Sequence, residues 1–189
     1  MNPRPPTQDE TARFSAVALP HTDAAYNLAL RLTRQAEAAE DLTHDAFVSA
    51  LAGFAAYRGG DARAWILTIV RRKAYDWLRA RAQSRVVPLH GDGEGEEELE
   101  FDMADPDQES PEQALIRKGE AAGVHAALDC LPPRLREVLV LREMEALSYR
   151  EIAEVTAAPI GSVMSRLARA RGQLAEAWRR LQRQKEAQA

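Results

Sequence analysis

Residues 147–171 read LSYREIAEVTAAPIGSVMSRLARAR, a stretch that predicts two helices joined by a short turn. Ser148 and Glu151 have the spacing of a capping box, in which each side chain accepts a hydrogen bond from a backbone N–H at the start of a helix. Leu147 and Ile152 occupy the positions of a hydrophobic staple around the same helix start. The first helix should therefore begin at the residue after Ser148.

A proline ends this helix and begins the next one. Pro159 stops an incoming helix and fits the first turn of the helix that follows. Beyond it, apolar residues recur at spacings of three and four, the pattern of a helix with one face toward a core. These residues are Ile160, Val163, Leu167, Ala170 and Leu174. The other face carries Ser162, Ser165, Arg166 and Arg169.

This pattern predicts a helix-turn-helix motif, because the second helix presents serine and arginine outward after a short turn. The second helix of such a motif enters the DNA major groove. There, arginine binds guanine through two hydrogen bonds, and serine bonds bases or phosphate. Tyr149 and Arg150, at the start of the first helix, are candidates to hold a phosphate near the positive end of the helix dipole. The alternative is an ordinary helical hairpin with a solvated basic face.

The first 90 residues predict three amphipathic helices. One runs through 26–32, a second begins near Glu40, and a third begins near Asp61, a residue type common at helix N-caps. The third helix suits nucleic acid, because basic charge follows phosphates and a ring can stack on an exposed base. Its basic and aromatic residues are Arg71, Arg72, Lys73, Tyr75, Arg79, Arg81 and Arg85. The alternative is a solvated basic face with Tyr75 packed at its edge.

Residues 41–47 read DLTHDAF and admit three interpretations. Asp41 and Asp45 share one helix face, close to His44, which could suit a metal or an acid–base site. Metal binding is the weakest interpretation, since no second histidine stands at ligand spacing. The second is a surface that docks another protein's helix, with an acidic rim around Leu42, Phe47 and Val48. The third is plain helix surface.

The net charge of −4 conceals a segregated charge distribution. Residues 1–90 carry 12 basic and 9 acidic side chains, and residues 113–189 carry 13 basic and 9 acidic ones. Residues 91–112 carry 11 acidic side chains and no basic ones. This acidic strip has few apolar residues and cannot bury enough surface to offset the entropy of ordering, so it is predicted to be a flexible linker. Two mildly basic blocks leave a polyanionic partner possible for each.

Composition excludes several classes of protein. Apolar runs fall far short of the ~20 residues that span a bilayer, and no apolar segment typical of a signal peptide follows the N-terminus. Cys130 is the one cysteine, which excludes an internal disulfide framework and a multi-cysteine zinc site. Aromatic residues make up 6% of the chain, and the abundance of Ala, Leu, Arg and Glu favours helices. We therefore expect an all-α cytoplasmic protein.

Several of these segments together resemble the extracytoplasmic-function group of bacterial sigma factors. Residues 131–138, 147–153 and 159–171 are similar to the fourth conserved region of that family. Residues 40–47 resemble the polymerase-binding motif of the second region, and residues 64–79 resemble the part of it that reads the minus-ten promoter element. Several motifs in the family's order are more specific than any one of them alone.

The resemblance implies an all-α fold with two small helical domains, joined by the acidic flexible linker. The expected divisions are an N-terminal tail at 1–21, sigma region 2 at 22–90, the acidic linker at 91–112 and sigma region 4, a helix-turn-helix domain, at 113–189. Region 2 would bind core polymerase and the minus-ten element, and region 4 would bind the minus-thirty-five element.

The resemblance also assigns residues by position. Core-polymerase binding falls to Asp41, Leu42, His44, Asp45 and Phe47. The minus-ten DNA falls to Trp65, Arg71, Arg72, Tyr75 and Arg79, with residues 57–61 near the loop that captures a base. The minus-thirty-five DNA falls to Tyr149, Arg150, Ser162, Met164, Ser165, Arg166, Ala168, Arg169 and Arg171.

The implied partners are the RNA polymerase core, through its β′ coiled coil and β flap, promoter DNA and an anti-sigma factor. No catalysis, cofactor, metal or small-molecule substrate is implied. Three residues depart from the family pattern: Arg72 stands where Asn is frequent, His44 where Gln is frequent, and Met164 where a basic residue is common. The promoter sequence and the affinity for polymerase therefore do not follow from the resemblance.

Two other classes of function stay open at this point. One is a helix-turn-helix transcriptional regulator that does not dock on polymerase. Such a regulator would keep specific duplex binding when residues 1–90 are deleted. The other is a hydrolase with a carboxylate–histidine site at residues 40–45. It ranks last, because no nucleophile, glycine-rich phosphate loop or ligand set accompanies these residues.

Overall fold

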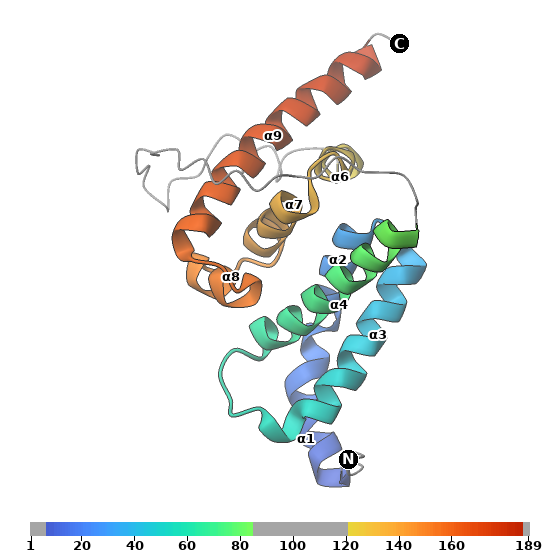
Figure 1. Cartoon of the computed structure of the whole chain (residues 1–189), viewed down its shortest axis with the longest axis vertical. Coiled ribbons are helices and arrows are strands. Elements are labelled where there is room, and N and C mark those ends of the chain that lie inside the picture. Colours follow the sequence, from blue (N-terminus) through green and yellow to red (C-terminus); the bar gives the residue numbers. More distant parts are fainter. Residues whose placement is uncertain (1–6, 85–120, 187–189) are drawn as a thin grey trace.

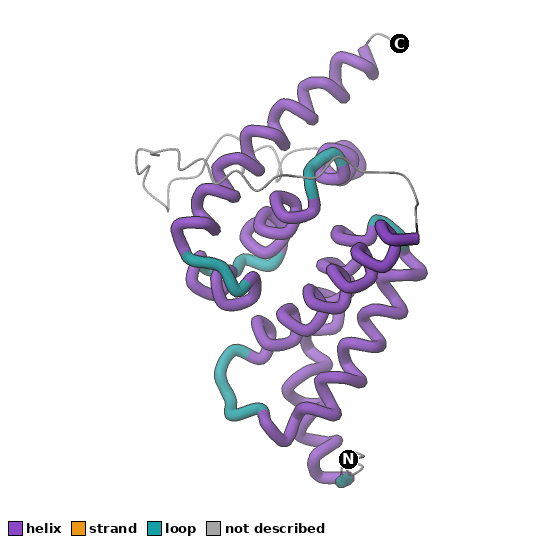
Figure 2. Tube along the Cα trace, in the orientation of Figure 1, coloured by secondary structure: helices purple, strands orange, loops and turns teal. Residues whose placement is uncertain are grey.

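The computed structural model describes residues 7–84 and 121–186, and every regular element within these two ranges is a helix (Figures 1 and 2). The prediction of an all-α fold is therefore confirmed for the described residues. The acidic segment 91–112 lies outside them, and its role as a flexible linker stays a prediction.

Four α-helices and two short 3₁₀ helices form the N-terminal domain. In chain order they are α1 Gln8–Ala18, η1 Leu19–His21, α2 Thr22–Thr33, α3 Ala36–Gly53, η2 Phe54–Ala56 and α4 Ala62–Ser84. Helices α2, α3 and α4 pack on one another, and α1 lies against α3 and α4. The largest side chains that this packing buries completely are Leu28, Leu32, Ile66, Leu67 and Val70. Removing these side chains from water is the main stabilising contribution in this domain.

Residues 1–21 were assigned to an N-terminal tail, but they contain helix α1, which packs on the core. Thr7 and Glu10 form a capping box at its start, with Thr7 N donating to the Glu10 carboxylate at 2.7 Å. Phe14 and Ala18 are buried, and the Phe14 ring meets the Phe54 ring edge-on with centroids 5.5 Å apart. Phe14 and Val17 are the two large apolar residues in α1, so its sequence carries little helical periodicity.

Helices α2 and α4 form over the segments that the sequence predicts, whereas α3 begins earlier than predicted. Asp61 caps α4, since its carboxylate accepts hydrogen bonds from the backbone N–H groups of Arg63 and Ala64 at 2.8 and 3.2 Å. Helix α3 begins at Ala36 rather than near Glu40. Alanine has the highest helix propensity and extends the first turn, although it contributes no strong periodic signal.

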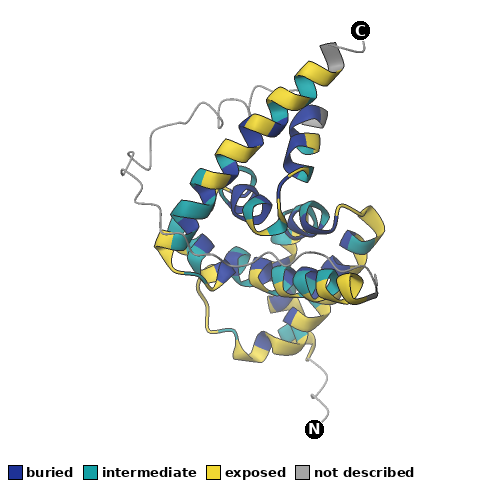
Figure 3. Cartoon of the chain, turned by 45° about the horizontal axis from the view of Figure 1, so that its top comes forward, coloured by how far each residue is buried: buried dark blue, intermediate teal, exposed yellow. Residues whose placement is uncertain are grey.

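The C-terminal domain contains α6 Ala121–Asp129, α7 Pro133–Leu139, a π-helical segment η3 Val140–Met144, α8 Tyr149–Thr156 and α9 Ile160–Glu186. Helix α9 packs against α6, α7 and α8. Its C-terminal end extends beyond these helices and carries many exposed residues (Figures 1 and 3). The core of this domain includes Val138, Leu139, Leu141, Ile152, Val163 and Leu167.

The helix-turn-helix has the geometry that its sequence predicts. Ser148 N donates to the Glu151 carboxylate at 2.6 Å, and Glu151 N donates to the Ser148 hydroxyl at 3.3 Å, which is the capping box. Leu147 and Ile152 are buried together at this helix start. Ala157 ends α8 in the left-handed conformation, with φ of 50°. In the apolar stripe of α9, Ile160 is 47% exposed, because it is the first residue of the helix and precedes the core.

The two domains are in contact. Helix α4 packs against α8, and α2 packs against α7 and η3, so the N-terminal domain meets the helix-turn-helix domain along both helices. Figure 1 shows α7 and α8 lying between α9 and the N-terminal bundle. This contact positions residues that the sequence assigns to DNA, and it shapes the candidate site.

Candidate nucleic-acid interface

Three aromatic rings stack beside the loop that leads from η2 into α4. The rings of Phe54 and Tyr57 have centroids 5.8 Å apart, and the rings of Tyr57 and Trp65 have centroids 4.6 Å apart. Tyr57 and Trp65 are only partly buried, so both retain accessible ring surface. Ring surface of this kind is what stacks on unpaired bases.

The loop before α4 bends sharply beside these rings. Gly59 and Gly60 have φ angles of 90° and 100°, a backbone region that side-chain-bearing residues rarely adopt. The Tyr57 hydroxyl donates to the Gly60 carbonyl at 2.8 Å and holds the bend. The loop lines an open cleft of about 420 Å³. Its lining includes Tyr57, Gly59, Gly60, Trp65, Thr68 and Glu154.

The α4 residues assigned to the minus-ten DNA separate into three groups. Arg72 and Arg79 are exposed on one side of the helix, as their common spacing predicts. Trp65 belongs to the aromatic cluster at the start of α4. Arg71 and Tyr75 face the C-terminal domain instead, although the spacing of Arg72, Tyr75 and Arg79 at i, i+3 and i+7 predicts a shared helix face. The sequence gives no sign of this second orientation, because it depends on contact with the other domain.

Arg71 and Tyr75 converge on the carboxylate of Glu137 in α7. Arg71 Nε donates to Glu137 Oε1, and the Tyr75 hydroxyl donates to Glu137 Oε2 at 3.1 Å. The Arg71 guanidinium also lies 4.9 Å from the centre of the Tyr75 ring. The Glu137 side chain is 1% exposed, and burial raises its pKa above the ordinary value while Arg71 opposes that rise. A buried carboxylate is tolerated here because both of its oxygens have donors.

A second group of contacts joins the domains at other points. Arg63 of α4 forms an ion pair with Glu145, which is buried. Arg136 of α7 is 2% exposed and donates to the carbonyl of Arg31 in α2 at 2.7 Å. The same guanidinium donates to the carbonyls of Leu128, Asp129 and Leu131. Burial lowers the pKa of Arg136.

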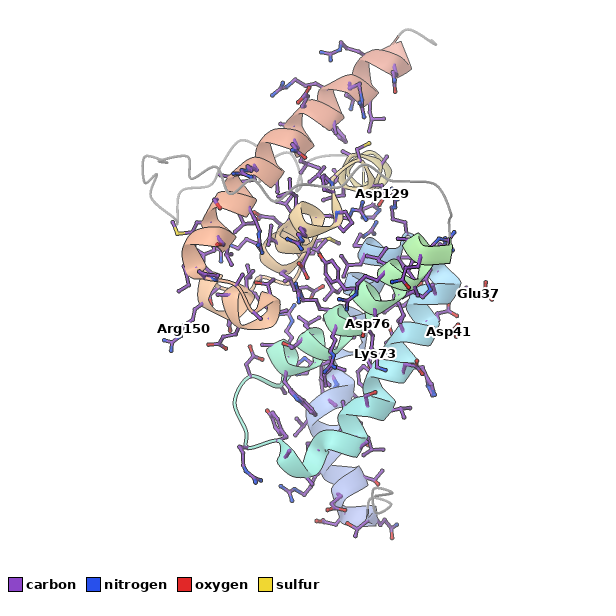
Figure 4. All side chains as sticks on the ribbon, viewed as in Figure 1. Glu37, Asp41, Lys73, Asp76, Asp129 and Arg150 are labelled. Atoms are coloured by element: carbon purple, nitrogen blue, oxygen red, sulfur yellow. The ribbon has the colours of Figure 1, made fainter. Side chains whose placement is uncertain are left out.

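The residues assigned to the minus-thirty-five DNA lie on α8 and the first half of α9. The Arg150 side chain is 84% exposed and points away from the domain (Figure 4). Its Nε lies 3.7 Å from Oε1 of Glu154, with which it forms an ion pair. The Tyr149 ring lies 4.9 Å from the Arg142 guanidinium. On α9, Arg169 is exposed, whereas five assigned residues are half-buried: Ser162, Met164, Ser165, Arg166 and Ala168. The face is therefore accessible in part.

Arg171 differs from the other α9 residues assigned to DNA. Its guanidinium forms an ion pair with Glu143 at 3.0 Å, and the two side chains are 18% and 13% exposed. This half-buried pair ties α9 to the end of η3. The structure therefore gives Arg171 a packing role in this arrangement, in addition to the DNA contact assigned to it by position.

The α3 surface assigned to polymerase is acidic and mostly exposed. Asp41, His44 and Asp45 are exposed (Figure 4 labels Asp41), and Val48 is 54% exposed beside them. Leu42 is 9% exposed and belongs to the core, so it is not part of an exposed ridge. Phe47 is half-buried, with its ring centre 6.3 Å from that of Phe14. The expected apolar ridge is thus reduced to Val48 and one edge of Phe47.

Sequence reasoning missed the residues that join the domains. Arg63 and Glu145 lie outside the motifs that carry the resemblance, whereas Arg136 and Glu137 lie within residues 131–138, whose resemblance assigns them no contact with the N-terminal domain. The available signal was a charged residue next to an apolar run, since Glu137 directly precedes the buried run 138–141. Such a position predicts a buried charge but does not identify its partner.

No group of three or more potential metal ligands of the His, Cys, Asp or Glu type occurs within residues 7–84 and 121–186. Across the same two ranges, none of the helices combines the length and apolarity needed to cross a bilayer.

Two family models match the chain, one on each domain. The model described as Sigma-70 region 2 matches residues 19–84, and the model described as Sigma-70, region 4 matches residues 122–174. The two matches follow the order predicted from the motifs. A match over the N-terminal domain also disfavours a regulator that uses only its helix-turn-helix.

Several relatives cover most of the chain. The RNA polymerase sigma-H factor of Pseudomonas aeruginosa is 36% identical over 159 residues, which are 84% of this chain and 82% of that protein. The ECF RNA polymerase sigma factor SigE of Mycolicibacterium smegmatis is 33% identical over 169 residues, which are 89% of this chain and 60% of that protein.

Solved structures share the fold. The sigma factor RpoE of Bartonella quintana, solved in complex with the anti-sigma factor NepR, has a TM-score of 0.65 and 24% identity, and covers 92% of this chain and 98% of that chain. CnrH, solved in complex with the cytosolic domain of CnrY, has a TM-score of 0.59 and 22% identity, covering 88% of this chain and 87% of that chain. With both family models, the relatives and the helical fold in agreement, the chain belongs to the extracytoplasmic-function sigma factors, the proteins that direct RNA polymerase to specific promoters.

Proposed function

We propose that the two domains divide promoter recognition, with the aromatic cleft and α4 binding the opened minus-ten strand and α9 reading the minus-thirty-five duplex. The observation that supports this most directly is the cleft that the stacked rings of Tyr57 and Trp65 help to line, at the start of the basic helix α4. Stacked rings and arginines on one surface suit a single strand whose bases are unpaired.

The minus-ten contacts follow from the geometry of α4. A base displaced from the duplex would enter the cleft and stack on Trp65 or Tyr57, while Arg72 and Arg79 hold the backbone phosphates. Arg71 and Tyr75 would join them once they are released from Glu137. The glycines of the loop allow the backbone to approach the base closely, because they carry no Cβ.

The minus-thirty-five contacts follow from the helix-turn-helix. Helix α9 would lie in the major groove, with Ser162, Ser165 and Arg169 toward base edges. The assigned set also includes Met164, Arg166, Ala168 and Arg171. Tyr149 and Arg150, at the N-terminus of α8, would hold a phosphate and fix the register of α9 on the duplex.

The exposed acidic surface of α3 would bind core polymerase. Asp41, His44 and Asp45 form this surface, with Val48 and the edge of Phe47 as its apolar part. Leu42 would support it from beneath. From the resemblance, the partners on polymerase are the β′ coiled coil for this domain and the β flap for the helix-turn-helix domain. Each domain would bind DNA weakly alone, and polymerase would fix both so that the second contact becomes intramolecular.

We also propose an anti-sigma partner, because two structures of the same fold were solved with NepR and with CnrY. Action on promoter DNA places the chain in the cytoplasm. Sigma factors are not enzymes, and we assign the chain no reaction, cofactor or small-molecule substrate.

Reconstitution with sigma-free core polymerase tests the function. We expect the chain to co-elute with core and to direct transcription from a subset of a genomic fragment pool. Asp45→Lys should abolish co-elution, whereas Asp23→Lys, the same charge change on exposed α2, should not. Trp65→Ala should preserve co-elution and lose strand opening, read by permanganate reactivity of unpaired thymines. Failure of the wild-type chain to co-elute would remove the proposed assignments.

A further inference from the structure

We propose that the C-terminal part of α9 is an additional DNA-binding surface. Arg180 and Arg183 would hold backbone phosphates beside the minus-thirty-five element, and Gly172 would let the DNA strand approach the helix closely. These contacts carry no sequence preference and strengthen binding to every promoter. The inference rests on the proposed placement of α9 in the major groove, and it concerns residues to which the resemblance assigns no role.

Helix α9 continues well past the part that is proposed to read bases. The match to Sigma-70, region 4 ends at residue 174, whereas α9 runs to Glu186 and projects beyond the other helices of its domain (Figure 1). At a rise of ~1.5 Å per residue, Arg180 and Arg183 lie about 16 and 21 Å from Arg169 along the helix axis. The major groove is about 12 Å wide, so a helix seated in it through its first half passes over a phosphate strand before it ends.

One stripe of exposed positions connects the two parts of α9. It contains, at spacings of three and four residues, Arg169, Gly172, Glu176, Arg180 and Arg183. Residues at these spacings share one face of a helix. Because Arg169 lies on the face that is proposed to meet DNA, Arg180 and Arg183 lie on the same side of α9 as the duplex.

The core of the C-terminal domain holds this part of α9 in place. Leu174 and Ala177 are buried, and the Trp178 ring lies against Gly123 of α6. Leu181, three residues farther on, is partly buried against the same core. The helix that carries the two arginines is therefore fixed in direction, so binding a phosphate does not require a flexible segment to become ordered.

Gly172 interrupts the stripe in the middle of the helix, and no contact within the protein explains it. A Cβ built at this position meets no atom within 4 Å. Glycine in a helix interior costs stability relative to alanine, so packing and helix propensity both favour a side chain here. Close approach of another backbone is a use of glycine that offsets this cost. The sugar–phosphate strand that bounds the groove supplies such a backbone.

The exposed charges at this end of α9 favour a phosphate backbone as the partner. Residues 172–184 contain the exposed arginines Arg179, Arg180 and Arg183 and one acidic residue, Glu176. Glu176 lies one turn before Arg179 and Arg180, whose charges offset its own. Nη2 of Arg180 lies 3.6 Å from Sγ of Cys130, a weak acceptor that a phosphate oxygen would replace.

The salt dependence of promoter binding tests the phosphate contacts. The probe is a fluorescein-labelled duplex fragment that the wild-type holoenzyme selects, and each variant is assembled with core polymerase. Arg180→Gln combined with Arg183→Gln should reduce the slope of log affinity against log salt by about 2, since each lost phosphate contact removes about one released ion. Gln8→Glu combined with Arg13→Gln makes the same change in net charge on exposed positions of α1 and should leave the slope unchanged.

Gly172→Gln separates the approach of DNA from the stability of the fold. Glutamine favours a helix more than glycine does, so this variant should resist urea at least as well as the wild-type chain. It should nevertheless bind the promoter duplex several-fold more weakly, because its side chain would stand between α9 and the strand. A variant that is more stable and binds DNA less tightly has lost a contact with DNA rather than its fold.

Each proposed contact has an outcome that contradicts it. An unchanged salt slope in the double arginine variant would overturn the phosphate contacts, and an unchanged affinity of Gly172→Gln would overturn the close approach. If the double variant instead fails to co-elute with core, its arginines bind polymerase and the inference is wrong. If the wild-type holoenzyme selects no fragment, the proposed function fails. If it selects one and neither the slope nor the affinity changes, the inference alone fails.

Discussion

The hydroxyl of Tyr75 donates a hydrogen bond to Glu137 over 3.1 Å and thereby joins a helix of each domain. Burial raises the pKa of Tyr75, and the negative charge of Glu137 raises it further. The ionised phenolate would lose the hydrogen bond and stand beside a carboxylate. Ionisation of Tyr75 would therefore weaken the interface.

Alkaline titration should resolve Tyr75 from the other tyrosines. The chain has four tyrosines, and we expect one of them to ionise only as the domain contact breaks. A folded-state pKa above the unfolded value contributes stability that is present below the unfolded pKa and lost as pH rises through the folded pKa. The measurement is phenolate absorbance near 295 nm against pH, followed together with circular dichroism.

The rise in phenolate absorbance at the highest pH should disappear in Tyr75→Phe and persist in Tyr149→Phe. Tyr149 is a suitable control, because its ring contacts Arg142 within the C-terminal domain rather than a carboxylate. If the absorbance rise at the highest pH survives Tyr75→Phe, another tyrosine ionises in that range. The contact between Tyr75 and Glu137 would then not be its cause.

Gly123→Ala should destabilise the C-terminal domain although alanine favours helices. A Cβ at this position would lie 2.7 Å from Cζ3 of Trp178, closer than real contacts allow. Overpacking costs about 1–3 kcal/mol, which exceeds the gain of about 0.5–1 kcal/mol from replacing glycine in a helix. Urea unfolding followed by circular dichroism measures the net loss of stability.

Gly172→Ala provides the matched comparison. Nothing lies within 4 Å of a Cβ built on Gly172, which is an exposed position within α9. This substitution should stabilise the chain by about 0.5–1 kcal/mol, since only the helix propensity changes. Equal effects of the two substitutions would show that Trp178 yields without cost, contrary to the packing described.

Local signals predicted the helix-turn-helix but not the contact between the domains. The capping box at Ser148 and Glu151 acts within four residues, so the sequence alone specifies it. Arg71, the partner of Glu137, is 66 residues away in the chain. A local sequence pattern cannot predict a contact over that separation. Residues 41–47 illustrate an intermediate case, because the helix was predictable whereas the burial of Leu42 depends on where α2 and α4 pack.

Ser148→Ala should destabilise the chain by about 1 kcal/mol, the usual cost of losing an N-cap. The hydrogen bonds from Ser148 lower the pKa of Glu151, and the side-chain bond is the larger cause. A depressed folded-state pKa contributes stability that is present above the unfolded pKa and lost as pH falls through the folded pKa. The cost of Ser148→Ala should therefore be greatest at neutral pH and shrink in acid.

Thermal unfolding at several pH values measures this dependence. Ser49→Ala, at an exposed position of α3, should change stability by no more than about 0.5 kcal/mol at any pH. If the cost of Ser148→Ala stays constant from neutral to acid pH, the stability that the N-cap contributes does not depend on the charge of Glu151.

Arg169→Ala tests whether α9 reads bases. Arg169 is exposed on the polar face of α9, and a lost contact to a base edge should cost about 1–3 kcal/mol and relax the preference at one promoter position. The readout is initiation by the variant holoenzyme on a library randomised across the minus-thirty-five element. Arg179→Ala, farther along the exposed side of α9, should leave the preference unchanged. Uniform weakening across all promoter sequences would instead identify Arg169 as a phosphate contact, because phosphates carry no sequence information.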